Sequence, residues 1–255
     1  MRRLLFFESF ILATAISLAP SPSPAQGLIA PGTILPISLN NSISSSKSRV
    51  GETFTGRIMQ DVPLPDRRRI RAGARVVGRV TELTPATASS GARIEFKIDT
   101  LISRQHNIPM RTILRALASP LDIEDAQIPV QGADRGTSPD SYTTVQIGGD
   151  VVYRGGGHVK HGGVVVGEPV PNGVLAQVSS NEARGCPDEV PGYHAAQALW
   201  LFSADACGVY GYHDFHIVDA GRLSPDGTIA LASDHGQIEI RSGSGILLRV
   251  QVTKR

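Results

Sequence analysis

Strict alternation of apolar and polar residues is clearest at positions 92–98. The apolar members are Ala92, Ile94, Phe96 and Ile98, and the charged members between them are Arg93, Glu95 and Lys97. A period of two places one set on a core face and the other in water, which predicts a β-strand. Residues 54–58 and 237–241 alternate in the same way. The pattern therefore predicts a β-rich protein.

Three segments, 29–39, 70–80 and 240–250, share one turn-and-strand pattern. Each has an apolar residue three positions before a glycine and apolar residues three and seven positions after it. Glycine adopts backbone angles that other residues avoid, so each copy predicts a turn that leads into a strand. The third copy lies far along the chain, so we expect the last strand to return to the N-terminal sheet. The alternative is three unrelated turn-strand units.

These patterns predict an all-β architecture, and the abundant glycine and proline with few aromatic residues agree with it. We expect a barrel or sandwich over residues 26–117, closed by a C-terminal strand within 236–255. A Pro/Gly/Ser-rich linker and Gly-rich segment would follow at 118–172, either flexible or folded as tight turns around short strands. Residues 173–235 would form an inserted, disulfide-pinned β-rich lobe, with a short helix at 194–202.

The N-terminal residues have the pattern of a secretory signal peptide. Arg2 and Arg3 precede an apolar run at residues 10–19, which is too short to span a membrane as a helix. Small residues at positions 23 and 25 predict cleavage after Ala25. The alternative is an uncut membrane anchor. We therefore expect a periplasmic or secreted protein with no integral membrane span in the mature chain.

Cys186 and Cys207 are the two cysteines of the chain. An even pair in an exported protein predicts a disulfide bond. The alternative is a pair of free, buried thiols. Zinc binding by this pair alone is disfavoured, since the close double-cysteine spacing of zinc sites is missing.

The overall charge and the missing motifs exclude several functions. Removal of residues 1–25 would lower the net charge from +2 to about +1, which disfavours a nucleic-acid partner. The sequence has no nucleophile elbow, zinc-protease motif or phosphate-binding loop. Glu124 and Asp125 lie in an expected loop, where carboxylates are usually solvated. We therefore assign no catalytic residue and no cofactor.

Histidines are the residues most suited to metal binding here, and six of the seven follow residue 157. The candidates for metal ligands are His158, His161, His213 and His235. His213 and His216 would face opposite sides of an expected strand at 209–218, so they would not share an ion. The alternative is that these histidines lie in surface loops.

Two further groups are candidates for binding a ligand or partner. Arg67, Arg68 and Arg69 form a basic cluster between two expected strands, suited to an acidic partner or a cell-wall polymer. Trp200, Tyr210 and Tyr212 concentrate aromatic surface that could bind a sugar or a protein. The alternative for the arginines is a solvated hairpin tip. The alternative for the aromatic residues is that they form the core of the lobe.

Part of the chain resembles a known family. The segments Pro31-Gly-Thr-Ile-Leu-Pro-Ile-Ser-Leu, 44–62 and Ile70-Arg-Ala-Gly-Ala-Arg-Val-Val-Gly-Arg-Val are similar to the C-terminal β-barrel of TrbI-type scaffold proteins of secretion and conjugation systems. The same residues, about 29–101, resemble small exported bacterial β-barrel proteins of unknown function. The resemblance implies a β-barrel and an envelope location. The family's proline-rich linker and pore-forming helices have no match here.

The function that these patterns favour is that of an exported, non-enzymatic envelope protein, acting as a structural or protein-interaction module. Its partners would be envelope proteins or a cell-wall polymer, and its oligomeric state is open. One alternative is a module that binds a carbohydrate or cell-wall ligand. A second is a metal-dependent enzyme that uses the C-terminal histidines.

Overall fold

A computed structural model describes residues 29–65, 67–103, 106–129, 143–153, 157–187 and 194–252. The expected signal peptide at 1–25 lies outside these residues. Within them nearly all of the regular secondary structure is β-strand, which confirms the all-β prediction.

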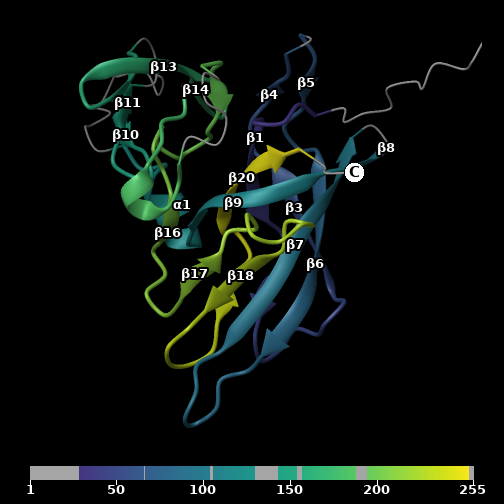
Figure 1. The fold of residues 1–255 in the computed structure, drawn as a ribbon. Helices are drawn as coiled ribbons and strands as arrows, with labels where there is room; N and C mark the ends of the chain where they lie inside the picture. The colour runs from purple at the N-terminus through teal and green to yellow at the C-terminus, as the bar shows by residue number, and fades with distance from the viewer. Residues whose placement is uncertain are drawn as a thin grey trace, which may run out of the picture.

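A ten-stranded sheet forms the body of the molecule (Figure 1). Its path runs through β16 (Gly208–Tyr210), β9 (Arg111–Ala118), β20 (Gly245–Gln251), β1 (Ile34–Leu39), β3 (Thr53–Ile58), β6 (Arg75–Thr84), β7 (Arg93–Ser103), β18 (Ile229–Ala232) and β17 (His216–Asp219), and β8 (His106–Pro109) also pairs with β7. Neighbouring strands are antiparallel, except that β16 runs parallel to β9. β7 contains most of the strict alternation at 92–98, so this predicted strand is confirmed.

The three turn-and-strand units become β1, β6 and β20. Their glycines, Gly32, Gly73 and Gly243, have φ angles of 89°, 86° and 86°, in the left-handed region that favours glycine. β20 pairs with β1, and Ile34 lies opposite Arg249. The predicted return of the C-terminal strand to the N-terminal sheet is therefore confirmed.

A smaller lobe sits at one end of the large sheet (Figure 1). Its four-stranded sheet consists of β12 (Val159–His161), β13 (Val164–Val170), β14 (Gly173–Ala176) and β15 (Gln197–Ala198), with β10 (Thr143–Val145) and β11 (Val151–Tyr153) as a separate pair. The remaining short elements are the pairs β2 (Ile43–Ser44) with β19 (Glu239–Ile240) and β4 (Val62–Pro63) with β5 (Arg69–Ile70), the helix α1 (Pro120–Asp125) and a single 3-10 turn, η2 (Glu182–Arg184).

Strands β1, β9 and β20 are buried on both faces, which explains their nearly continuous apolar sequences. One face, with Leu35 and Leu248, joins the core of the large sheet, where Phe54 and Phe96 pack edge to face. The other face, with Ile34, joins a second core formed with the lobe. The lobe is therefore packed against the large sheet through apolar side chains.

A closed barrel, one form of the expected architecture, is not detected within the residues that the structure describes. Across the described residues the strand pairing is an open path from β16 to β17. The free edge of β9 pairs with β16 over residues 116–118, so it is not available there to β17. The backbone N–H of Leu114 in β9 donates a hydrogen bond to the carbonyl oxygen of Ala220, in the segment after β17. The side chain of Arg111, also in β9, donates to the carbonyl oxygens of Gly221 and Ser224 in the same segment.

The expected boundaries also need correction. Residues 208–232 contribute β16, β17 and β18 to the large sheet, so they are not part of an inserted lobe at 173–235. The expected linker at 118–172 contains α1 and strands β10 to β13. Glycines within it form tight turns, with Gly148, Gly149 and Gly163 at positive φ.

Three local predictions differ from the structure for identifiable reasons. Residues 194–202 contain β15 and no helix. Glu124 and Asp125 lie in α1, because Ser119 caps that helix: its Oγ accepts a hydrogen bond from the N–H of Asp122. The expected strand at 209–218 is interrupted by Gly211, where φ is 65°. No helix in the described part of the chain is long and apolar enough to cross a membrane.

Candidate functional site

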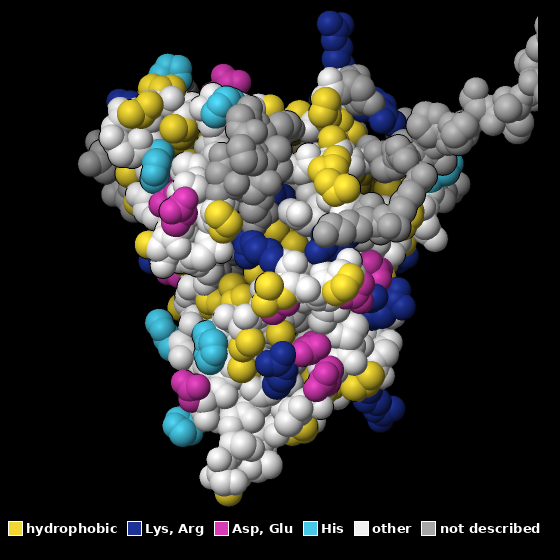
Figure 2. Space-filling view, viewed as in Figure 1, with side chains coloured by type: hydrophobic (Ala, Val, Ile, Leu, Met, Phe, Trp, Pro, Cys, Tyr) yellow, Lys and Arg dark blue, Asp and Glu magenta, His cyan; other side chains and the backbone are white. Residues whose placement is uncertain are grey.

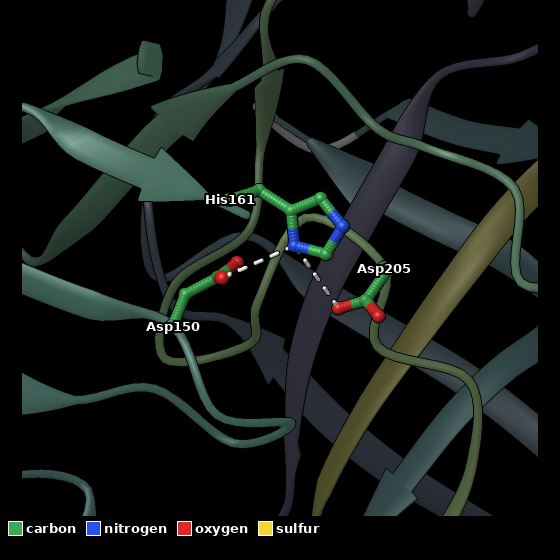
Figure 3. A group of neighbouring side chains, drawn as sticks. All are labelled: Asp150, His161 and Asp205. Atoms are coloured by element: carbon green, nitrogen blue, oxygen red, sulfur yellow. Dashed lines mark hydrogen bonds and ion pairs between the residues drawn. The ribbon is translucent and has the colours of Figure 1, made fainter. Parts of the chain in front are cut away.

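Asp150, His161 and Asp205 converge in the lobe (Figure 3). The Nδ1 atom of His161 lies 3.1 Å from Oδ1 of Asp150 and 3.8 Å from Oδ1 of Asp205. One potential ligand atom from each side chain lies within 4.8 Å of the others. Among the described residues, this is the group of His, Cys, Asp and Glu side chains whose geometry could hold a metal ion.

The three residues come from separate segments, each held by its own contacts. Asp150 follows the Gly148–Gly149 turn and precedes β11, and its Oδ2 accepts a 3.1 Å hydrogen bond from the N–H of Ala204. His161 ends β12. Asp205 accepts a 2.9 Å hydrogen bond from the hydroxyl of Ser203. The arrangement therefore exists only in the folded lobe.

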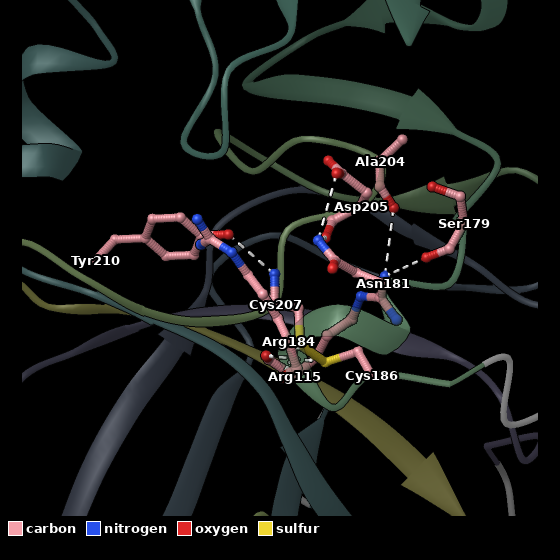
Figure 4. Close-up of a disulfide and its surroundings, with 9 residues drawn as sticks. All are labelled: Arg115, Ser179, Asn181, Arg184, Cys186, Ala204, Asp205, Cys207 and Tyr210. Atoms are coloured by element: carbon pink, nitrogen blue, oxygen red, sulfur yellow. Dashed lines mark hydrogen bonds between the residues drawn. A yellow bond between two sulfur atoms is a disulfide. The ribbon is translucent and has the colours of Figure 1, made fainter. Parts of the chain in front are cut away.

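The predicted disulfide between Cys186 and Cys207 is present beside this group (Figure 4). The two Cα atoms are 6.0 Å apart, within the range that a disulfide requires. Cys207 follows Asp205 by two residues, and its N–H donates a 3.0 Å hydrogen bond to the hydroxyl of Tyr210. The guanidinium of Arg184 lies 5.4 Å from the centre of the Tyr210 ring.

Arg115 further fixes the loop that carries Asp205. This almost completely buried side chain of β9 donates from Nη2 to the carbonyl oxygens of Ser179 and Ala204, at 2.5 and 3.4 Å (Figure 4). Asn181 Nδ2 also lies 3.2 Å from the carbonyl oxygen of Asp205. Side chains of the large sheet and of the lobe therefore both support the Asp205 loop.

Of the candidate histidines, the structure brings His161 alone into this group. His158, His213 and His235 are exposed. The ligand group around His161 contains two aspartates and no second histidine, so the possible pairing of His161 with His213 or His235 is not formed there.

The candidate aromatic residues do not form an exposed platform. Trp200 is buried, and Tyr210 and Tyr212 are half-buried. The Tyr212 ring packs 4.9 Å from that of Phe215, and its hydroxyl is 2.6 Å from Oγ of Ser244. These contacts give Tyr212 a structural role beside the core of the large sheet.

Trp200 also borders a hollow of about 680 Å³ between the large sheet, α1 and the lobe. Ile58, Ile123 and Leu201 contribute its apolar surface, while Arg57 and Glu124 contribute charge. Trp200 has a φ angle of 53°, which is unusual for a bulky residue. Residues held in such conformations occur often at ligand sites.

The predicted arginine cluster lies on the β4–β5 hairpin. Arg67, Arg68 and Arg69 are exposed, and Figure 2 shows basic side chains projecting at the end of the molecule where this hairpin lies. The carboxylate of Asp61 lies 3.1 Å from a guanidinium nitrogen of Arg69 and of Arg71. A hydrogen bond from the N–H of Ala72, together with these arginines, lowers the pKa of Asp61.

A second hollow, of about 490 Å³, lies beside this hairpin. Its apolar surface includes Ile29, Leu64 and Ile108, of which Ile29 is buried. The three arginines of the cluster also line it. The surface therefore combines apolar contact area with positive charge.

No sequence pattern singles out Asp150 or Asp205 as a metal ligand. They are separated from His161 by eleven and forty-four positions in the chain, so no local spacing connects them. Asp150 follows two glycines, and Asp205 lies two residues before Cys207. Neither feature is specific for metal sites.

Comparison with protein-family models, with curated proteins and with solved structures finds no match to this chain. The resemblance to TrbI-type proteins therefore remains a prediction from residues 29–101.

Proposed function

We propose that this chain is an exported, non-enzymatic protein of the cell envelope that acts as a protein-interaction module. Its partner would be another envelope protein, which binds through an acidic segment at the β4–β5 hairpin. The observation that carries this proposal is the hollow beside that hairpin, where Arg67, Arg68 and Arg69 border an apolar surface.

The disulfide supports a location outside the cytoplasm. Disulfides persist in oxidising compartments and are rare where thiols are kept reduced. Cys186 and Cys207 are each about 2% exposed, so their bond is protected from reductants once it has formed. The signal-like pattern of residues 1–25 supports the same location.

The chemistry of the hairpin supports an acidic protein partner. Guanidinium groups bind carboxylates through two parallel hydrogen bonds and are weakly hydrated, so they suit interfaces. Asp61 pairs with Arg69 and Arg71, and Arg67 and Arg68 are exposed on the same hairpin. The apolar surface next to them would accept an aliphatic side chain of the same acidic segment.

A charge-reversal experiment tests the proposal. Cells would produce the wild-type protein, R67E/R68E, or the control R49E/R241E, which reverses two exposed arginines elsewhere. In-cell crosslinking and mass spectrometry would identify the partners. We expect a reproducible acidic partner for the wild type and the control, and its loss in R67E/R68E. Equal crosslinking of all three, or crosslinks to cell-wall polymer alone, would contradict the proposal.

A second candidate function is binding of a small cell-wall carbohydrate in the hollow beside Trp200. The unusual φ angle of Trp200 at the edge of that hollow favours it. Trp200 is the single tryptophan of the chain, so its fluorescence reports on this hollow directly. Saturable quenching or a spectral shift with a cell-wall oligosaccharide would support binding, and an unchanged spectrum across such oligosaccharides would contradict it.

A further inference from the structure

We infer that Asp150, His161 and Asp205 form a binding site for a divalent transition-metal ion such as Zn²⁺. The site is separate from the β4–β5 hairpin and does not depend on the proposed interaction function. It was not apparent from the sequence, because its residues come from three separate segments of the lobe.

The spacing of the potential ligand atoms fits such an ion. Zn²⁺ binds imidazole nitrogen and carboxylate oxygen at about 2.0–2.2 Å, which places ligand atoms about 3 to 4 Å apart. The Nδ1 atom of His161 lies 3.1 Å from Asp150 Oδ1 and 3.8 Å from Asp205 Oδ1. A small shift of the side chains would bring all three atoms to bonding distance of one ion.

The charge of the group favours a cation. The side chain of Asp150 is 9% exposed, and burial of a carboxylate is unfavourable unless a partner compensates its charge. A second carboxylate, that of Asp205, lies 3.8 Å from the same imidazole nitrogen. Because there are two carboxylates and one imidazole, the group remains negative whether His161 is neutral or protonated, and a divalent ion would neutralise it.

Neighbouring hydrogen bonds hold the carboxylates in position. Ala204 donates its N–H to Oδ2 of Asp150, the oxygen that does not face His161. Ser203 donates its hydroxyl to Oδ1 of Asp205. Such outer contacts orient metal ligands and strengthen binding. In the same turn as Asp150, the buried Oε1 of Gln146 accepts no hydrogen bond from any described residue.

The ligand types indicate which ions would bind. Imidazole nitrogen favours Zn²⁺ and other first-row transition metals, whereas Ca²⁺ and Mg²⁺ prefer oxygen ligands throughout. The side chains of His161 and Asp205 are 36% and 25% exposed, so water can reach the group. Three protein ligands with water in a remaining position is a common arrangement for Zn²⁺.

The experiment measures Zn²⁺ binding to the full chain, exported without a histidine tag and treated with a chelator that is then removed. Isothermal titration would compare the wild type with His161→Ala and Asp205→Asn. His158→Ala is the matched control, because it removes an exposed histidine three positions away. We expect one Zn²⁺ per chain, an affinity at least tenfold lower in both site variants, and an unchanged affinity in the control.

A second measurement avoids dependence on variant folding. In NMR spectra of the wild-type protein, stoichiometric Zn²⁺ should shift the ring signals of His161 and leave those of His158 and His213 unchanged. A simple Asp150–His161 ion pair with no metal function would give no stoichiometric binding and no selective shift. Either of those results, or wild-type affinity in both site variants, would overturn the inference.

Discussion

The side chain of Gln60 joins the large sheet to the lobe through the backbone of Trp200. Its Oε1 accepts a 2.7 Å hydrogen bond from the N–H of Trp200, and its Nε2 donates a 2.7 Å hydrogen bond to the carbonyl oxygen of Val174. Gln60 is completely buried. One amide therefore bonds two backbone groups of the lobe, and the carbonyl oxygen of Val174 also accepts a hydrogen bond from the N–H of Leu199.

A second buried amide makes the reciprocal connection. Gln197, in β15 of the lobe, accepts a 3.0 Å hydrogen bond at Oε1 from the backbone N–H of Ile34 in β1. Polar contacts with fixed geometry thus accompany the apolar packing between the two parts. They specify one docked arrangement, because a shifted lobe would deprive the N–H groups of Trp200 and Ile34 of these hydrogen bonds.

The first prediction concerns Gln60→Leu. The substitution keeps the volume but leaves the N–H of Trp200 without a partner. The carbonyl oxygen of Val174 loses its hydrogen bond from Gln60 and keeps the one from the N–H of Leu199. One buried unpaired group costs about 1–3 kcal/mol, so we expect the free energy of unfolding to fall by about 1–3 kcal/mol. Urea denaturation measures it. Gln177→Leu, at an exposed position, is the control and should change stability by less than about 0.5 kcal/mol. Equal effects of the two substitutions would show that the buried amide has no special role.

The second prediction concerns the disulfide. Replacing both Cys186 and Cys207 with alanine removes a covalent link between residues 21 positions apart. The chain-entropy estimate for a loop of that size is a loss of about 3 kcal/mol in unfolding free energy. Because Asp205 lies two residues from Cys207, we also expect weaker Zn²⁺ binding. Thermal denaturation and Zn²⁺ titration of the folded variant measure the two effects. An unchanged melting temperature would contradict the structural role.

The third prediction concerns acid stability. Hydrogen bonds from Ser224, Lys97 and Thr228 lower the pKa of Asp226 well below its ordinary value of 3.8. A lowered folded-state pKa contributes stability above the unfolded-state pKa, and this contribution is lost as the pH falls through the folded-state pKa. We therefore expect Asp226→Asn to weaken the loss of stability below about pH 4. Denaturation at pH 5, 4, 3 and 2 measures it, and parallel curves for the variant and wild type would refute the assignment.

The sequence predicted the features that depend on local pattern. Alternation identified β7, and the three glycine turns identified β1, β6 and β20. The cysteine pair predicted the disulfide. The strands were predictable because alternation and glycine turns depend on neighbouring residues. The disulfide was predictable because paired cysteines in an exported protein usually form one.

Features that depend on distant contacts were not predictable. Trp200 interrupts the expected helix because its backbone N–H is bonded to Gln60, 140 positions away. The large sheet does not close because the short strand β16 pairs with the edge of β9. The Asp150–His161–Asp205 group forms only after the lobe has folded. None of these three contacts has a local sequence pattern that would predict it.

Site-specific photocrosslinking from the β4–β5 hairpin tests the central claim most directly. A photoreactive residue would replace Arg67 in one variant and the exposed Arg49 in the control, each in the full chain in its native cells. We predict a crosslink to one acidic envelope protein from position 67 and none to that protein from position 49. No crosslink from position 67, or the same products from both positions, would contradict the account of this chain as an envelope interaction module.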